Sequence, residues 1–98
     1  MTYSVWSMNG KIKFLERVNI KSADKARLVA INYTTDDSPA YIEENGKLKY
    51  IIFQRLKPGK IGNSNNNYVF ICVTIVDFYN RKKDKVAYIS KKTGKLYR

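Results

Sequence analysis

The stretch YVFICVTIVDFY, residues 68–79, gives the strongest indication of a β-strand in this chain. Valine, isoleucine, threonine and aromatic residues, which fit a pleated and half-buried surface, occupy nearly every position. We therefore predict one long strand over residues 68–79. Its single charged residue is Asp77, which we expect at a solvent-exposed strand end or beside a cross-strand Lys or Arg, with a functional acid as the other interpretation.

Two Asn-Gly pairs, Asn9-Gly10 and Asn45-Gly46, divide the rest of the sheet into hairpins. This pair favours a type I′ turn, because both central residues of that turn need positive φ. The strands that we predict beside the two turns are residues 2–8, 11–18, 40–44 and 47–57. The arm at 47–57 is rich in apolar residues, as expected of a central strand that is covered on both faces.

Residues 23–33 show the spacing of a helix. Apolar residues recur three and four positions apart, at Ala26, Val29, Ala30 and Tyr33. Ser22 is suited to cap the first turn, and Asp24 places a carboxylate where the helix dipole favours one. The segment TTDDSP, residues 34–39, combines side chains that bond their own backbone with a proline, so we predict a loop there.

The remaining segments predict short strands and loops. Strands are expected at 85–90 and 95–98 with turns at 80–84 and 91–94, and the polar run 60–67 predicts a mobile loop. Neighbouring strands with short connections pair antiparallel. We predict a single compact domain over residues 1–98, of the α+β class, with one helix packed on a curved, mainly antiparallel β-sheet of about five to six strands.

The composition excludes several kinds of chemistry. Histidine is absent and Cys72 is the single cysteine, so the usual general base, the Ser-His and Cys-His nucleophiles and the Cys and His zinc sets cannot be assembled. Cys72 lies in an apolar run and is interpreted as a small core residue. Asp36-Asp37 is expected to bond loop amides, and Glu43-Glu44 points to opposite strand faces. We expect no enzyme activity, no cofactor and no metal site.

Membrane and export signals are not evident in the sequence. Apolar runs stay short of the ~18 residues that suggest a membrane span. The first residues lack the apolar block of a signal peptide. We expect a cytoplasmic, intracellular protein without membrane contact.

Positive charge is the one feature in excess. Lys and Arg number 19 against 8 Asp and Glu, which gives a net charge of +11 and a long-range positive field. Alternation along the predicted strand 11–18 gives it two faces. The basic and exposed face carries Lys11, Lys13, Leu15 and Arg17, and the mostly apolar face carries Ile12, Phe14, Glu16 and Val18.

Two further basic groups are expected in or beside turns, at 81–85 and 91–95. They lie at the two ends of a predicted strand about 20 Å long. A nucleic-acid backbone could follow this strand and place phosphates beside both groups. Tyr88 and Tyr97 lie nearest the second group and offer rings for base stacking. The candidate nucleic-acid-binding residues are Lys11, Lys13, Arg17, Arg81, Lys82, Lys83, Lys85, Lys91, Lys92, Lys95, Tyr88 and Tyr97.

The class of partner stays open between nucleic acid and protein. Lysine outnumbers arginine by 14 to 5, which suits phosphate attraction with little sequence specificity, on DNA or RNA. The alternative is a phage or mobile-element accessory or inhibitor protein that docks on an acidic or nucleic-acid-binding host protein. Exposed lysines also serve solubility and protect edge strands, and a homodimer through an edge strand is compatible with the sequence.

The helix 23–33 and the ending VAYIS-KKTGKL, residues 86–96, resemble PepSY and cystatin-like domains. That family places a helix before an antiparallel sheet and often has a Thr-Gly turn after an extended strand. Here Thr93-Gly94 forms the equivalent pair, and a lysine replaces the acidic residue that is usual before the turn. The resemblance implies a role in inhibiting or regulating another protein.

Overall fold

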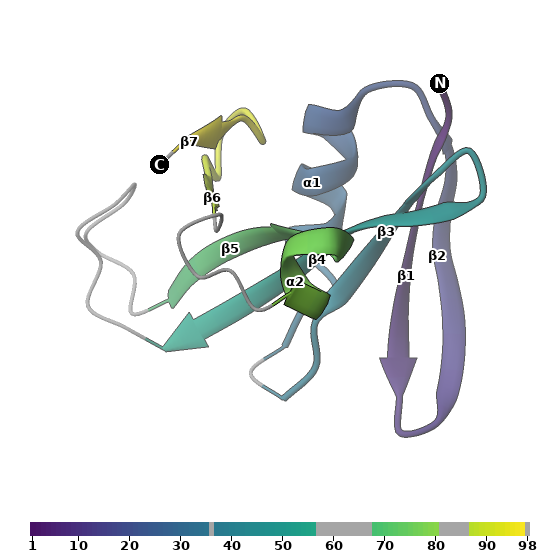
Figure 1. The fold of residues 1–98 in the computed structure, drawn as a ribbon, viewed down its shortest axis with the longest axis horizontal. Coiled ribbons are helices and arrows are strands. Elements are labelled where there is room, and N and C mark those ends of the chain that lie inside the picture. The colour runs from purple at the N-terminus through teal and green to yellow at the C-terminus, as the bar shows by residue number, and fades with distance from the viewer. Residues whose placement is uncertain (36, 57–67, 81–86, 98) are drawn as a thin grey trace.

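The computed structural model describes residues 1–35, 37–56, 68–80 and 87–97. Within these ranges seven strands form one open antiparallel sheet (Figure 1). The strands are β1 (Tyr3–Asn9), β2 (Ile12–Ile20), β3 (Ala40–Glu44), β4 (Lys47–Leu56), β5 (Tyr68–Thr74), β6 (Ala87–Ile89) and β7 (Leu96–Tyr97), and the helices are α1 (Ala23–Ile31) and α2 (Ile75–Asn80). The predicted α+β class is confirmed, with more strands than expected and a second helix.

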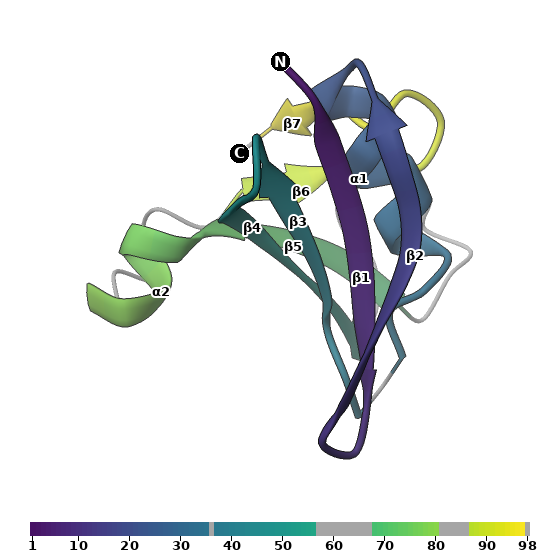
Figure 2. The ribbon, with the colours of Figure 1, turned by 90° about the vertical axis from the view of Figure 1, so that its right-hand side faces the viewer.

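The strand order is β2-β1-β3-β4-β5-β6-β7. After the β1–β2 hairpin the chain passes through α1 and returns as β3 beside β1, so β2 becomes an edge of the sheet. Ile20, at the end of β2, and Gly94, between β6 and β7, both contact the layer formed by α1. The sheet therefore curves around α1, while α2 lies on the opposite side (Figure 2). We call the two sides the α1 face and the α2 face.

The main core lies between α1 and the α1 face. Val5, Ile42 and Ile52 are completely buried there, on three strands that lie near the middle of the sheet. Ala26 and Ala30 of the helix are completely buried as well, and their small side chains allow α1 to approach the strands closely. Burial of each large aliphatic side chain contributes about 1.5–3 kcal/mol, so this contact supplies much of the stability.

The predicted start of α1 is confirmed. The Ser22 hydroxyl accepts a hydrogen bond from the Lys25 amide at 3.3 Å, and Asp24 lies in the first turn. The helix ends at Ile31, before the predicted end at Tyr33. In the loop that follows, the buried Thr34 hydroxyl donates to the Ile52 carbonyl at 3.2 Å, which ties the loop to β4.

Only one of the two Asn-Gly pairs forms the turn predicted from it. Asn45 and Gly46 have φ of 51° and 85°, as a type I′ turn between β3 and β4 requires. In the first hairpin Asn9 pairs with Ile12, so the central residues of the turn are Gly10 and Lys11. Because only Gly10 has positive φ there, at 63°, this turn is not type I′.

The predicted strand over residues 68–79 is wrong in its second half. β5 ends at Thr74, and α2 begins at Ile75. The Thr74 hydroxyl accepts a hydrogen bond from the Asp77 amide at 3.1 Å and donates to the Asp77 carboxylate. This Thr-x-x-Asp arrangement caps a helix N-terminus, and it overrides the β-propensity of the apolar residues between. Asp77 thus lies in the first turn of α2, capped by Thr74, and is not on a strand.

The predicted faces of the second strand are also wrong. Two register shifts interrupt the β1–β2 ladder, near the pairs Tyr3–Ile20 and Val5–Arg17. The shifts place Arg17 opposite Val5, whereas Lys13 and Leu15 pair with Met8 and Trp6, whose side chains point to the other face. The expected apolar face stays largely exposed, because β2 extends past the layer that α1 covers.

Several predictions lie outside the described residues. They are the mobile loop at 60–67, the turn at 80–84 beyond Asn80, and the basic group Arg81, Lys82, Lys83 and Lys85. The predicted strand 85–90 is described from Ala87, as β6. The turn at 91–94 and the short strand after it are confirmed as the β6–β7 connection.

Replacing Thr74 by Ala tests the cap of α2. The loss of the hydroxyl should reduce the free energy of unfolding by about 1 kcal/mol, because one amide of the first turn loses its partner. Thr74→Ser keeps the hydroxyl and should stay near the wild-type value. Urea denaturation measures the free energy of unfolding. The amide hydrogen of Asp77 should exchange faster in Thr74→Ala than in Thr74→Ser. Equal exchange rates in the two variants would contradict the capping role.

Cys72 lies in the main core, as predicted, and is 3% exposed. Burial raises the pKa of its thiol to about 12, against an ordinary value of 9.0. Burial and the nearby Glu44 carboxylate also raise the pKa of Tyr3 above 10.0. At alkaline pH, above the ordinary pKa of each group, the folded chain therefore still holds a proton that the unfolded chain has released.

Stability should consequently fall at alkaline pH. Between about pH 9 and 12 the unfolded state binds fewer protons than the folded state, so the free energy of unfolding decreases as the pH rises. Urea denaturation at pH 8, 9.5 and 11 measures this dependence. Cys72→Ala should show a smaller decrease across the same range, and an identical decrease would mean that the Cys72 thiol does not contribute.

Candidate nucleic-acid interface

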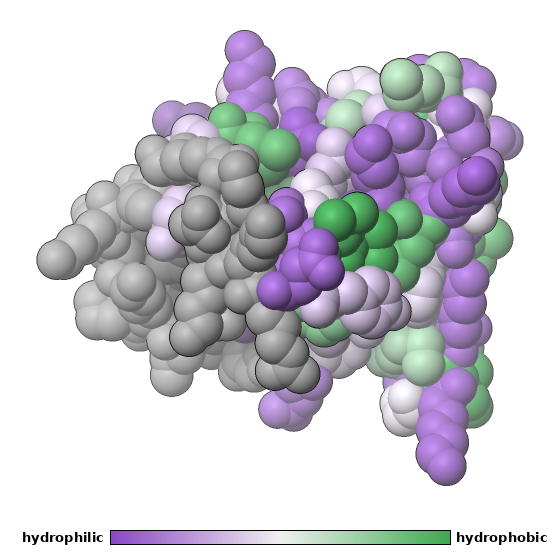
Figure 3. Space-filling model, viewed as in Figure 1, coloured by the Kyte–Doolittle hydropathy of each residue, from purple (hydrophilic) through white to green (hydrophobic). Residues whose placement is uncertain are grey.

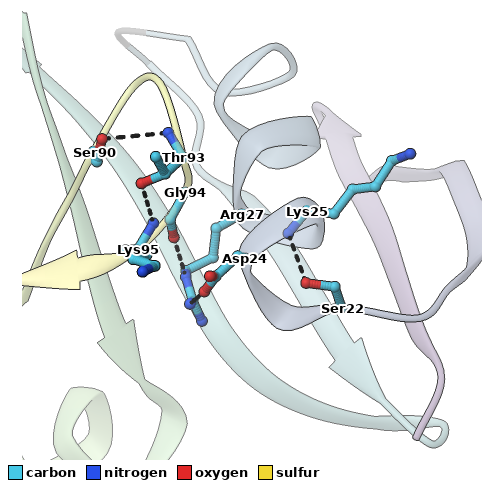
Figure 4. A network of polar contacts seen from close by, with 8 residues as sticks. All are labelled: Ser22, Asp24, Lys25, Arg27, Ser90, Thr93, Gly94 and Lys95. Carbon is cyan, nitrogen blue, oxygen red and sulfur yellow. Dashed lines mark hydrogen bonds and ion pairs between the residues drawn. The ribbon is translucent and has the colours of Figure 1, made fainter.

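Residues 90–95, between β6 and β7, form a turn closed by its own side chains (Figure 4). The Ser90 hydroxyl accepts hydrogen bonds from the amides of Lys92 and Thr93, both at 3.3 Å. The Gly94 amide donates to the Ser90 carbonyl at 2.9 Å, and the Thr93 hydroxyl accepts from the Lys95 amide at 3.3 Å. These bonds hold the backbone of the turn in one conformation. We call it the C-terminal lysine turn, after Lys91, Lys92 and Lys95.

Arg27 anchors this turn to α1. Its Nε donates to the Gly94 carbonyl at 2.7 Å, and its Nη2 forms an ion pair with Asp24, one turn earlier in the helix. The guanidinium also lies 5.6 Å from the ring centre of Tyr50. Arg27 is only 5% exposed, and a buried guanidinium is tolerated when such partners satisfy it. The anchor therefore joins α1, β4 and the turn.

Gly94 allows the turn to lie directly on the helix. A Cβ atom at this position would come within 2.0 Å of the Asp24 carbonyl oxygen. Its φ of 79° is also a conformation that L side chains rarely adopt. Both features require glycine, so the Thr93-Gly94 pair fits the close contact with α1.

The anchored turn presents its lysines to solvent. Lys91, Lys92 and Lys95 are all exposed, and the Lys91 ammonium lies 5.7 Å from the ring centre of Phe70. Among the described residues, none of the three has a carboxylate within 4.0 Å. Lys25 is close in the fold, but Figure 4 shows its side chain pointing away from the turn. The structure thus places these three predicted residues together.

Tyr88 and Tyr97 form a pair on β6 and β7. The two residues are register partners, and their ring centres lie 6.5 Å apart. Tyr88 packs with Phe53 and Ile71 in a second, smaller apolar cluster on the α2 face. Both rings are half-buried, so each keeps part of its surface accessible, on the two strands that the C-terminal lysine turn connects.

The predicted residues of the first hairpin do not join this group. Lys11 lies in the turn at its tip, and β2 and β7 are opposite edges of the sheet. Lys13 forms an ion pair with Glu43 at 3.2 Å and lies 4.3 Å from the ring centre of Trp6. Arg17 is exposed on the other face from Lys13.

Trp6 is not available for base stacking. Its ring stacks on Tyr41 with a centroid distance of 4.1 Å and an interplanar angle of 10°, while Lys13 lies over the ring as well. The indole is thus covered by two side chains of its own chain, and its buried Nε1 has no hydrogen-bond partner in the part of the chain that the structure describes. We interpret this group as packing on the α2 face of β1 and β3.

Helix α2 adds an apolar surface that the sequence reasoning missed. Val76, Phe78 and Tyr79 are 62%, 41% and 72% exposed, although Phe78 also stacks on Phe53. Figure 3 looks onto this face and shows hydrophobic residues reaching the surface near its centre. The signal that could have revealed the helix is the Thr-x-x-Asp spacing of Thr74 and Asp77.

The described carboxylates are mostly engaged within the fold. Asp24, Glu43 and Glu44 form ion pairs with Arg27, Lys13 and Lys49. Glu16 accepts a hydrogen bond from Ser7 at 2.7 Å, and the Asp77 carboxylate accepts one from the Thr74 hydroxyl. Over the described ranges, no group of three or more potential metal ligands occurs. The lysines of the C-terminal turn therefore keep their charge without local neutralisation.

A scan against protein-family models finds no match, and no curated protein or solved structure is found to be similar to the chain. The similarity of residues 23–33 and 86–96 to PepSY and cystatin-like domains stays a prediction from the sequence. Among the helices of the described residues, none combines the length and the apolar character that crossing a membrane needs.

Arg27→Met and Gly94→Ala test the anchor of the turn. Methionine keeps most of the side-chain volume but leaves the Gly94 carbonyl without a donor, which should cost about 1–3 kcal/mol of unfolding free energy. Gly94→Ala adds strain at positive φ and a clash, and should cost at least about 2 kcal/mol. Urea denaturation measures both losses.

Hydrogen exchange distinguishes a local anchor from general destabilisation. In both variants the amides of residues 88–95 should lose protection before those of α1 and β1. Lys92→Ala, an exposed change in the same turn, should stay within about 0.5 kcal/mol of the wild type. Uniform loss of protection over the whole sheet would show that Arg27 does not hold the turn in particular.

Proposed function

We propose that this protein acts without catalysis and binds nucleic acid through phosphate contacts, with the C-terminal lysine turn as the centre of the interface. The observation that carries the proposal is the fixed turn that presents Lys91, Lys92 and Lys95 with no carboxylate nearby among the described residues. A net charge of +11 adds a field that attracts polyanions toward every side of the molecule.

The physical basis is counterion release. Each phosphate that a lysine neutralises frees a condensed counterion, so affinity falls with salt in proportion to the number of contacts. The bonds within residues 90–95 and the Arg27 anchor order the backbone before binding, which lowers the entropy cost of placing three cations together. Lysines act as point charges, so little sequence preference is expected.

Tyr88 and Tyr97 favour a single strand over a duplex as the ligand. Their half-buried rings lie on β6 and β7, the two strands that the lysine turn connects, and bases of a single strand can stack on accessible ring surface. A duplex keeps its bases stacked inside the helix and would use the lysines alone. The two tyrosines therefore add affinity only for unpaired bases.

Fluorescence anisotropy with labelled single-stranded DNA, duplex DNA and RNA, titrated from about 50 to 300 mM salt, tests the proposal. We expect binding that weakens linearly in log salt. The triple variant Lys91→Ala, Lys92→Ala, Lys95→Ala should reduce the slope by about 2 on a single strand, since each lost contact removes about 0.7. The triple variant should also bind every nucleotide sequence more weakly, by about the same factor.

A charge-matched control separates the turn from the overall charge. Lys11→Ala, Lys21→Ala, Lys47→Ala also removes three exposed lysines without a described ion pair, but from three other places in the fold. The control should change the slope by less than half as much. Equal effects of the two triples would reject the turn as the interface, and no binding at about 50 mM salt would reject nucleic acid as the ligand.

A further inference from the structure

β2 is the long free edge of the sheet. It spans nine residues and, among the described residues, pairs with β1 alone. The other edge, β7, has only two residues in the strand, which is a common way to protect a sheet edge from further pairing. β2 therefore offers many more unpaired backbone groups to another chain than β7 does.

The side chains of β2 are unusually apolar for an exposed edge. Ile12, Phe14, Leu15 and Val18 are 60%, 45%, 59% and 49% exposed. They lie on both faces of the strand, since Phe14 pairs with Ser7 and Leu15 with Trp6. A strand added outside β2 would cover apolar surface on both faces at once.

The regular part of the edge is the segment 12–15. It pairs residue by residue with β1, whereas the register shifts affect the ladder beyond Leu15. Asn9 and Ile12 flank a two-residue turn, and the residues that flank such a turn form a hydrogen-bonded pair. Hydrogen-bonded and non-hydrogen-bonded pairs alternate along an antiparallel ladder. The backbone N–H and C=O groups of Lys13 and Leu15 therefore point away from β1. These two residues provide donors and acceptors for a further strand.

Charge decides which chain fits this edge. Lys11 and Arg17 are exposed cations along it, Lys13 is engaged with Glu43, and its one carboxylate, Glu16, accepts a hydrogen bond from Ser7. A second copy of the protein would bring the same cations against them, in addition to a net charge of +11 on each molecule. An extended segment that alternates acidic and apolar residues would instead complement both the cations and the exposed apolar side chains.

We propose that β2 binds an extended acidic and apolar segment of another protein as an eighth strand of the sheet. Main-chain hydrogen bonds to Lys13 and Leu15 supply the affinity, and Ile12, Phe14 and Leu15 select apolar side chains. This site lies at the opposite edge from the C-terminal lysine turn and does not depend on the proposed nucleic-acid function.

The probe is a capped eight-residue peptide that alternates glutamate and valine, compared with its counterpart that alternates lysine and valine. Titration into the whole protein, followed by two-dimensional NMR, should shift resonances of residues 11–17 with the acidic peptide only. Amide exchange at Lys13 and Leu15 should slow at least tenfold in its presence, since their N–H groups gain acceptors. This readout needs no variant.

Leu15→Pro and Leu15→Ala form a matched pair. Proline removes the outward N–H of residue 15 without removing a bond to β1, and edge strands tolerate it. It should weaken binding of the acidic peptide at least tenfold, against less than about threefold for alanine, which keeps the N–H. Both variants should keep the salt-dependent nucleic-acid binding of the wild type.

Three outcomes would overturn the proposal. They are equal binding of the two peptides, protection of amides outside β2 with none at Lys13 and Leu15, and sedimentation of the free protein as a dimer that Leu15→Pro dissociates. The last result would show that the edge is covered by a second copy.

Discussion

The buried guanidinium of Arg27 connects α1, β4 and the C-terminal hairpin through polar contacts. β6 and β7 contain three and two residues, so their ladders supply few hydrogen bonds. A buried cation requires partners, and here these are Asp24, the Gly94 carbonyl and the ring of Tyr50. The close approach of the C-terminal hairpin to α1 satisfies this requirement.

Ion pairs within the fold engage several of the carboxylates. Asp24 pairs with Arg27, Glu43 of β3 with Lys13 of β2, two strands away, and Glu44 with Lys49 of the adjacent β4. The cations of the lysine turn have no such partners among the described residues and point to solvent. One edge of the sheet thus carries a fixed cationic turn, and the other carries a long strand with exposed apolar side chains. The two surfaces therefore do not overlap.

Short sequence patterns correctly predicted the elements whose conformation depends on one local interaction. Ser22 caps α1 and Asn45-Gly46 forms a type I′ turn, because each depends on neighbours within four residues. The prediction failed where two local signals compete. At Thr74 the helix cap prevails over β-propensity, and in β2 the register shifts break the alternation that separated basic from apolar residues.

The sequence by itself determined the α+β class, the strong positive charge and the absence of histidine chemistry, since these depend on composition and short-range pattern. Only the tertiary structure decided where the lysine turn lies and which other cations stay apart from it. Arg27 meets Gly94 across 67 positions, and that contact places the locally closed turn on α1. Lys13 and Arg17 separate for the same reason: pairing between strands, which no local pattern encodes, sets the face on which each side chain lies.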